Sequence, residues 1–274
     1  MQEELLHIFP LHLRETLQKV TMKENTLEEI RIRIGQPVIF HMENEEWYLK
    51  KETGRLERSQ VNAYCATKED IKSMVKFISS YSLYAYEDEM KRGFITMQGG
   101  HRIGVAGQVV MDGGKVLSLS NIYFLNIRVA REKRGCAKDI IPYLIHRNNI
   151  YNTLFVSPPG IGKTTYLRDA IRILSNGSDR LHGMKISIID ERSEIAACRQ
   201  GIPQNDIGIR SDVLDGCLKS FGMLLMLRSM APQIIAVDEI GSREDCRAME
   251  QAIYSGSRII GTVHAYDMKE LSRK

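Results

Sequence analysis

A glycine-rich segment constrains the fold of this chain more than any other part of its sequence. It reads Ser157-Pro-Pro-Gly-Ile-Gly-Lys-Thr-Thr165 and lies between an apolar run, residues 151–156, and an amphipathic run, residues 165–174. The first run is typical of a short buried strand and the second of a helix. A strand, a glycine-rich turn and a helix in this order form the context in which such a motif binds a nucleoside triphosphate. We therefore predict a nucleotide-binding α/β domain around this segment.

The residue types in this loop suit phosphate binding. Gly160 and Gly162 let backbone N–H groups approach phosphate closely, and the helix N-terminus adds a partial positive charge there. Lys163 would contact the β- and γ-phosphates, and the hydroxyl of Thr164 would bind Mg²⁺. Ser157 replaces the usual first glycine, so we expect a negative φ at this position. The residues expected around the nucleotide in this loop are Ser157, Pro158, Pro159, Gly160, Ile161, Gly162, Lys163, Thr164 and Thr165.

Two apolar strands further along the chain end in pairs of acidic residues. One pair is Asp190 and Glu191, and the other is Asp238 and Glu239. Because parallel strands bring their carboxyl ends to one edge of a sheet, both pairs should face the phosphate loop. Asp238 would accept a water ligand of Mg²⁺, and Glu239 would act as the general base or orient the attacking water. Asp190 and Glu191 can hold Mg²⁺ through water or polarise the attacking water.

A third apolar run, residues 258–263, precedes His264. This run is typical of another buried strand, and Thr262 and His264 lie at its end. A threonine or histidine at that edge can hydrogen-bond the γ-phosphate or the catalytic water. We therefore include His264 among the candidate catalytic residues, with Lys163, Glu191 and Glu239.

The remainder of the chain predicts a second, smaller domain. Residues 1–125 mix helical and strand patterns and indicate an α+β domain, with glycines breaking residues 93–111 into three short strands. Residues 126–148 are expected to form a basic linker and a connecting helix, which begins near residue 138. Residues 149–274 would form the nucleotide-binding domain.

Composition narrows the function classes. A length of 274 residues fits about two domains, and a net charge of +4 is too small to indicate nucleic-acid binding by itself. The five cysteines include no C-x-x-C pair, which favours reduced thiols in a cytoplasm. The first residues lack the features of a signal peptide, and no run of eighteen apolar residues occurs. We expect a cytoplasmic protein without a transmembrane segment and without a nucleic-acid partner.

The order of these motifs resembles the secretion and traffic ATPases, which power type II and type IV secretion and pilus machines. The phosphate loop, residues 188–194, residues 228–241 and Gly261-Thr-Val-His-Ala265 correspond to the Walker A, Asp box, Walker B and His box motifs of that superfamily. Gln233 occupies a motif position at which the superfamily usually has an aspartate. Within the superfamily, nearly the whole chain resembles the stage III sporulation AA family. That narrower resemblance is carried by residues 28–35, 99–107, 190–196, 209–217 and 237–241.

The resemblance implies more than the residues show alone. It implies a RecA-like ATPase core under a PAS-like N-terminal domain, with ATP and Mg²⁺ as ligands. It also implies a hexameric ring in the cytoplasm of the mother cell, peripheral to the membrane. The ring would bind membrane proteins of a sporulation channel complex. Superfamily members usually continue with C-terminal helices, so we expect this chain to be truncated at its C-terminus.

The mechanism expected from these features is Mg²⁺-dependent ATP hydrolysis, with Asp190, Glu191 and His264 sensing the γ-phosphate. Phosphoryl transfer needs additional positive charge, which arginines of a neighbouring subunit or of the N-terminal domain would supply. The candidates are Arg192, Arg210, Arg228, Arg102 and Arg128. Two alternatives stay open. One is a RecA-like nucleic-acid translocase, and the other is a scaffold that binds ATP with negligible turnover.

Overall fold

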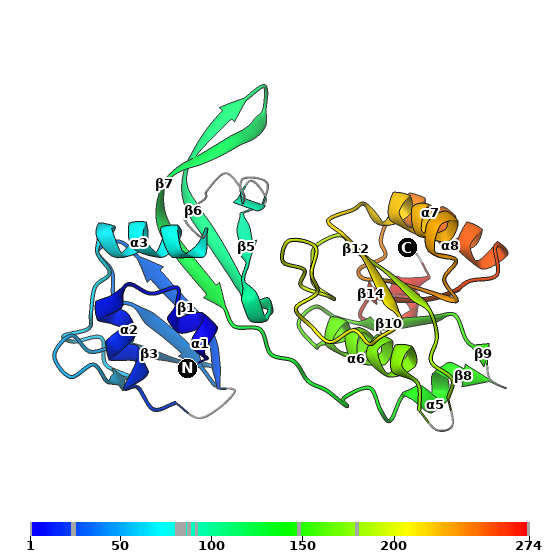
Figure 1. Ribbon diagram of the computed structural model, residues 1–274, viewed down its shortest axis with the longest axis horizontal. Coiled ribbons are helices and arrows are strands. Elements are labelled where there is room, and N and C mark those ends of the chain that lie inside the picture. Colours follow the sequence, from blue (N-terminus) through cyan, green and yellow to red (C-terminus); the bar gives the residue numbers. More distant parts are fainter. Residues whose placement is uncertain are drawn as a thin grey trace. The chain divides into compact units, whose positions relative to one another are not determined.

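The computed structural model describes residues 2–22, 26–79, 86, 89–90, 93–146, 149–178 and 181–272. The chain is of mixed α/β class and forms two compact units, Met1–Arg131 and Glu132–Lys274 (Figure 1). Each unit has its own sheet and its own hydrophobic core.

The first unit is built on an antiparallel sheet of seven strands in the order β4-β3-β2-β1-β7-β6-β5. Among the described residues, its α-helices are α1 (Glu3–Leu6), α2 (Leu11–Gln18) and α3 (Lys68–Ile78), and a 3₁₀ helix, η2 (Gln98–Gly100), precedes β6. Its strands are β1 (Leu27–Arg33), β2 (Ile39–Met42), β3 (Glu45–Leu49), β4 (Leu56–Glu57), β5 (Phe94–Thr96), β6 (Arg102–Asp112) and β7 (Lys115–Arg128).

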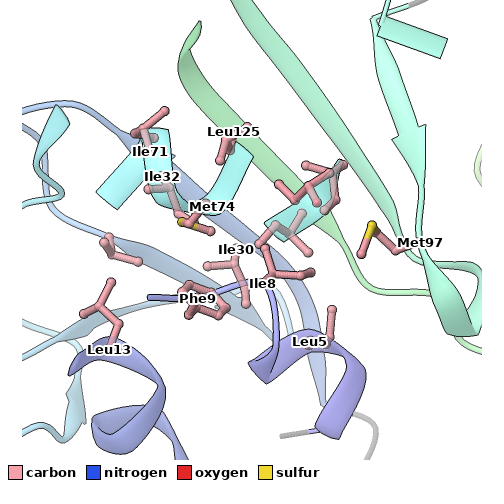
Figure 2. Close-up of a cluster of buried hydrophobic side chains, with 14 of the residues drawn as sticks. Leu5, Ile8, Phe9, Leu13, Ile30, Ile32, Ile71, Met74, Met97 and Leu125 are labelled. Atoms are coloured by element: carbon pink, nitrogen blue, oxygen red, sulfur yellow. The ribbon is translucent and has the colours of Figure 1, made fainter. Parts of the chain in front are cut away.

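The core of this unit lies between the helices and one face of the sheet. Ile30 and Ile32 alternate with charged residues along β1 and are fully buried, as strand periodicity requires. They meet Ile8 and Phe9 of the α1–α2 segment and Met74 of α3 in one cluster (Figure 2). A capping box between Thr67 and Asp70 fixes the start of α3.

Strand β6 differs from the expectation that glycines break residues 93–111 into three short strands, because β6 runs through Gly107 and pairs with β7. The two strands form one continuous hairpin that extends beyond the rest of the sheet (Figure 1). Gly107 does not end β6 but lies at a bulge in it, where a β-carbon would come within 2.4 Å of the carbonyl oxygen of Asn121. Strand β7 continues to Arg128, so residues 126–128 belong to the sheet and not to a linker.

The segment before the phosphate loop also differs from its prediction. A helix from residue 138 is absent, and helix α5 (Ile141–Leu144) covers a single turn. Pro142 is tolerated only in the first turn of a helix, which explains why the helix starts so late. The chain then enters β8 (Ile145–His146), which pairs with β9 (Asn149–Ile150).

The second unit is built on a parallel sheet of five strands in the order β10-β14-β13-β11-β12. The strands are β10 (Thr153–Ser157), β11 (Ile186–Asp190), β12 (Ser211–Asp215), β13 (Ile234–Val237) and β14 (Arg258–His264). The helices are α6 (Lys163–Asn176), α7 (Lys219–Met230), α8 (Arg243–Tyr254) and the short α9 (Met268–Leu271).

Helices cover both faces of this sheet. Ile234 and Ala236 of β13 pack in the cluster that contains α6, whereas Ile235 and Val237 pack in the cluster that contains α7 and α8. A strand buried on both faces has an uninterrupted apolar sequence, which is why β13 lacks the alternation of β1. The arrangement leaves the carboxyl ends of the strands at one edge, next to the start of α6.

Candidate nucleotide-binding site

The glycine-rich segment forms the turn between β10 and α6. Gly160 and Gly162 adopt φ values of 80° and 92°, which lie in the left-handed region that favours glycine. A β-carbon on Gly160 would meet no atom within 4 Å, so the loop is open at this residue. Ser157 ends β10 and does not have a positive φ, as the sequence predicts. The loop therefore has the backbone freedom that wrapping around a phosphate requires.

Lys163 begins α6 and is largely buried. Its Nζ donates hydrogen bonds to the carbonyl oxygens of Ser157 and Pro158, each at 2.8 Å. A lysine ammonium rarely lies buried unless its charge has partners. These contacts hold the charge within the loop, at the N-terminal end of the helix.

Thr164 and Asp238 meet although 74 positions separate them in the sequence. The hydroxyl of Thr164 donates to Oδ2 of Asp238 at 2.7 Å. The other oxygen, Oδ1, accepts from the hydroxyl of Thr262 on β14. A hydroxyl and a carboxylate oxygen thus lie together beside Lys163, which is a donor set that suits Mg²⁺ bound to substrate phosphates.

Glu239 follows Asp238 with an unusual backbone. Its φ of 51° is rare for a residue with a β-carbon. The carboxylate is engaged at both oxygens, since Oε1 lies 2.7 Å from Nε2 of His264 and Oε2 accepts from Arg192. Burial acts to raise the pKa of Glu239, but the hydrogen bond with His264 and the charge of Arg192 outweigh it. The pKa of this carboxyl therefore lies below its ordinary value.

Asp190 is buried, and its carboxylate serves the loop that follows β11. It accepts backbone N–H bonds from Glu194 at 2.7 Å, Ile195 at 3.0 Å and Ala196 at 2.8 Å. Burial raises the pKa of Asp190, although these three amides act in the opposite direction. The carboxylate thus orders a turn, and its oxygens already have partners within the chain.

Glu191 forms an ion pair with Lys219, the first residue of α7. A narrow recess brings this pair together with the acidic end of β13. Its lining comprises Asp190, Glu191, Arg192, Glu194, Lys219, Asp238 and Glu239. The structure therefore brings both predicted acidic pairs to one edge. Lys219 could not be predicted from the sequence because no motif surrounds it.

Arg168 is a second residue without a sequence signal. It lies on α6, and its guanidinium donates to the carbonyl oxygens of Glu194 and Ile195, each at 2.6 Å. These bonds tie the loop after β11 to the helix that follows the phosphate loop. Arg168 thereby helps to keep the two parts of the site in register.

The arginines predicted to act at the nucleotide differ in their distance from the glycine-rich loop. Arg192 reaches Glu239, whereas Arg210 donates to the carbonyl oxygens of Ser175 and Asn176 at the far end of α6. That end lies about 20 Å along the helix from the phosphate loop. Arg228 lies in the last turn of α7 and lines a hollow at the edge where β13 and β14 begin. The structure does not bring Arg210 or Arg228 to the loop of their own chain.

The other two candidate arginines belong to the first unit. Arg102 and Arg128 face each other in the register of β6 and β7.

Within the described residues, no group of three or more His, Cys, Asp or Glu side chains is arranged to hold a metal ion. The described helices include none with the length and apolarity needed to cross a membrane.

The fold and the arrangement of this site together define the class of domain to which the second unit belongs. A parallel sheet with a phosphate loop after its edge strand β10 and an acidic pair after β13 is the architecture of a RecA-like P-loop nucleotide-binding domain. Two solved structures share the fold. The pilus retraction motor PilT with bound ADP superposes with a TM-score of 0.59 at 16% identity, over 96% of this chain and 68% of that one. The Legionella pneumophila ATPase DotB gives a TM-score of 0.55 at 16% identity, over 96% of this chain and 66% of that one.

The chain belongs to the family described as sporulation stage III, protein AA, whose model matches residues 1–274. A relative, the stage III sporulation protein AA of Bacillus subtilis (strain 168), is 39% identical over 272 residues. That match covers 99% of this chain and 84% of the relative. The uncharacterized protein ycf45 of Cyanidium caldarium is 32% identical over 155 residues, covering 56% of this chain and 44% of that protein. The resemblance drawn from the motifs is thus confirmed.

Proposed function

We propose that this chain is a Mg²⁺-dependent ATPase that powers or gates a complex at the cell envelope during sporulation. The observation that carries the proposal is the hydrogen bond of 2.7 Å between Thr164 and Asp238. It joins the helix after the phosphate loop to the acidic end of β13, beside Lys163 and Glu239. The same hydroxyl and carboxylate are the groups that P-loop enzymes use to hold Mg²⁺.

The residues present suit ATP and Mg²⁺. The amides around Gly160 and Gly162, together with Lys163, would hold the phosphates. Thr164 and Asp238 would hold the metal ion, whose charge would offset that of the phosphates. These residues come from one loop and one strand end, so they act within a single chain.

Glu239 is the residue that we assign to the attacking water. Its ionised carboxylate can accept a proton or a hydrogen bond, and His264 and Arg192 orient it. Glu191, paired with Lys219, would sense the γ-phosphate from the neighbouring strand. Asp190 would act through the turn that it orders.

The assembly and the partners are inferred from similar proteins. The solved neighbours are named as an ATPase and as a pilus retraction motor, and a relative is named as a sporulation protein. We infer a hexameric ring in the cytoplasm of the mother cell, attached to membrane proteins of a channel complex. Arginines of a neighbouring subunit would complete the charge at each site. No nucleic acid is needed for this role.

The test is phosphate release from ATP with and without Mg²⁺. Lys163→Ala and Glu239→Gln should each abolish release, while Lys163→Ala should also weaken nucleotide binding. Matched controls are Lys185→Ala and Glu250→Gln, which change exposed residues of the same types away from the site. Both controls should keep the activity of the wild type.

The outcomes separate the alternatives. Tight ATP binding without phosphate release, in the wild type and in Glu239→Gln alike, would replace the motor with an ATP-dependent scaffold. Strong stimulation by single- or double-stranded DNA would favour a nucleic-acid translocase. Activity that rises more than linearly with protein concentration would support sites completed by a neighbouring subunit, and light scattering would give the ring size.

A further inference from the structure

Thr262 lies in the middle of the nucleotide-binding unit and not on its surface. It belongs to β14, which runs between β10 and β13, and it is completely buried. Its neighbours on the strand include the buried Ile260 and Val263. Burying a hydroxyl in such a setting costs free energy unless the hydroxyl is hydrogen-bonded. The hydrogen-bond partners of Thr262 therefore indicate its role.

The hydroxyl of Thr262 makes two bonds to the acidic pair. It donates to Oδ1 of Asp238 and accepts the backbone N–H of Glu239 at 2.8 Å. The carbonyl oxygen of Thr262 also accepts the N–H of Ile240 at 2.9 Å. One residue of β14 thereby holds three consecutive residues that leave β13.

The hydrogen bonds of Thr262 lie on both sides of a residue with an unfavourable backbone conformation, Glu239. Glu239 has a φ of 51°, a value that residues with a β-carbon adopt only when their surroundings require it. Bonds from Thr262 reach the N–H groups of Glu239 and of Ile240, on either side of the Glu239 α-carbon. The turn directs the carboxylate of Glu239 to His264 and Arg192.

The same hydroxyl orients the carboxylate of Asp238. Oδ1 accepts from Thr262 and, at 3.1 Å, from the backbone N–H of Glu239, and Oδ2 is turned to the hydroxyl of Thr164 at 2.7 Å. Without the hydroxyl of Thr262, Oδ1 would keep only the longer bond from Glu239, whose own N–H would also have lost its bond to Thr262. The buried hydroxyl of Thr262 and the N–H of Glu239 thus hold Oδ1 together, and Thr262 contacts both of the groups concerned.

We propose that Thr262 is a positioning residue that aims both acidic side chains of this site without touching the nucleotide. Its complete burial separates it from His264, which lies at the open end of the same strand. The inference rests on the proposed function where it predicts a change in kcat. The hydrogen bonds of Thr262 do not depend on turnover, so Mg²⁺-dependent nucleotide binding provides a second measurement.

The experiment compares Thr262→Val, Thr262→Ser and Ser257→Ala in the full chain. Valine has the shape of threonine but no hydroxyl, whereas serine keeps the hydroxyl. Ser257 supplies the control, because its buried hydroxyl donates to the carbonyl oxygen of Pro232 at 2.8 Å near the opposite end of β14. Phosphate release is measured against ATP and against Mg²⁺, and thermal unfolding is recorded for every variant.

We expect Thr262→Val to lower kcat by about tenfold or more, the effect of losing a hydrogen bond to a charged group. The Mg²⁺ concentration for half-maximal release should rise, while KM for ATP changes by less than about twofold. Thr262→Ser should restore most of kcat. Ser257→Ala should lower the unfolding temperature without changing kcat or the Mg²⁺ dependence.

Wild-type kcat and Mg²⁺ dependence in Thr262→Val would overturn the inference. So would an equal loss of kcat in Ser257→Ala, because the effect would then be one of stability. If the wild type releases no phosphate, the proposed function fails, and binding of a fluorescent ATP analogue decides the inference alone. Thr262→Val should then lose the gain in affinity that Mg²⁺ gives the wild type. An unchanged gain, or no gain in the wild type, would refute the inference.

Discussion

Gly261 is packed so closely that adding one methyl group should destabilise the nucleotide-binding unit. A β-carbon at this position would lie 2.5 Å from Cδ1 of Ile240, 3.2 Å from the carbonyl oxygen of Val237 and 3.3 Å from Cγ2 of Val237. The end of the Ile240 side chain can move, but the carbonyl oxygen of Val237 is fixed by the sheet. Overpacking of this kind costs about 1–3 kcal/mol.

The entropy that alanine removes from the unfolded chain offsets about 0.4–1 kcal/mol of that cost. We therefore expect Gly261→Ala to lower the free energy of unfolding by about 1–2 kcal/mol, or the melting temperature by about 3–6 °C for a unit of this size. Differential scanning calorimetry measures both quantities. Gly241→Ala is the control, since a β-carbon there would meet only the carbonyl oxygen of Glu239, at 4.0 Å.

A double variant tests the cause. Ile240→Val removes the atom closest to the added methyl group and alone costs about 0.5–1.5 kcal/mol. If the clash is the reason for the instability, Gly261→Ala with Ile240→Val should lose less than the sum of the two single variants. An unchanged melting temperature in Gly261→Ala, or strictly additive losses in the double variant, would refute the reasoning.

Two further predictions concern charged groups of the same unit. Because the pKa of Glu239 is lowered in the folded state, its stabilising contribution is fully present above the ordinary carboxyl pKa of about 4.3 and is lost as the pH falls through the lower folded value. Glu239→Gln should therefore lower stability at pH 7 by at most about 1 kcal/mol, given the exposure of Arg192, and by less in acid; a difference that stays constant with pH in calorimetry would contradict this. Arg210→Ala should cost about 1–2 kcal/mol, because its guanidinium holds the last carbonyl oxygens of α6, while leaving the affinity for ATP unchanged. Weaker ATP binding at an unchanged melting temperature would show that Arg210 acts at a nucleotide instead.

Much of the site could be predicted because its signals are local. The turn around Gly160 and Gly162 needs a backbone that only glycine adopts readily, and β10 and α6 on either side carry their own periodicity. The acidic ends of β11 and β13 could be assigned to one edge because parallel strands end at the same edge of a sheet.

Other features had no local signal. Gly107 looked like the end of a strand, yet it allows β6 to pass Asn121 within a long hairpin. The basic residues near the site were indistinguishable in the sequence. Arg192 and Lys219 meet acidic partners there, whereas Arg210 closes the far end of a helix.

By itself, the sequence determined that this chain has a glycine-rich loop between a strand and a helix, buried parallel strands and acidic residues where those strands end. Each of these depends on backbone geometry or on the period of apolar residues over a few positions. Only the tertiary structure decided which groups share a hydrogen bond, as when Thr262 holds Asp238 and Thr164 reaches the same carboxylate. Those partnerships depend on the order and register of strands far apart in the chain, and burial then makes each polar contact specific.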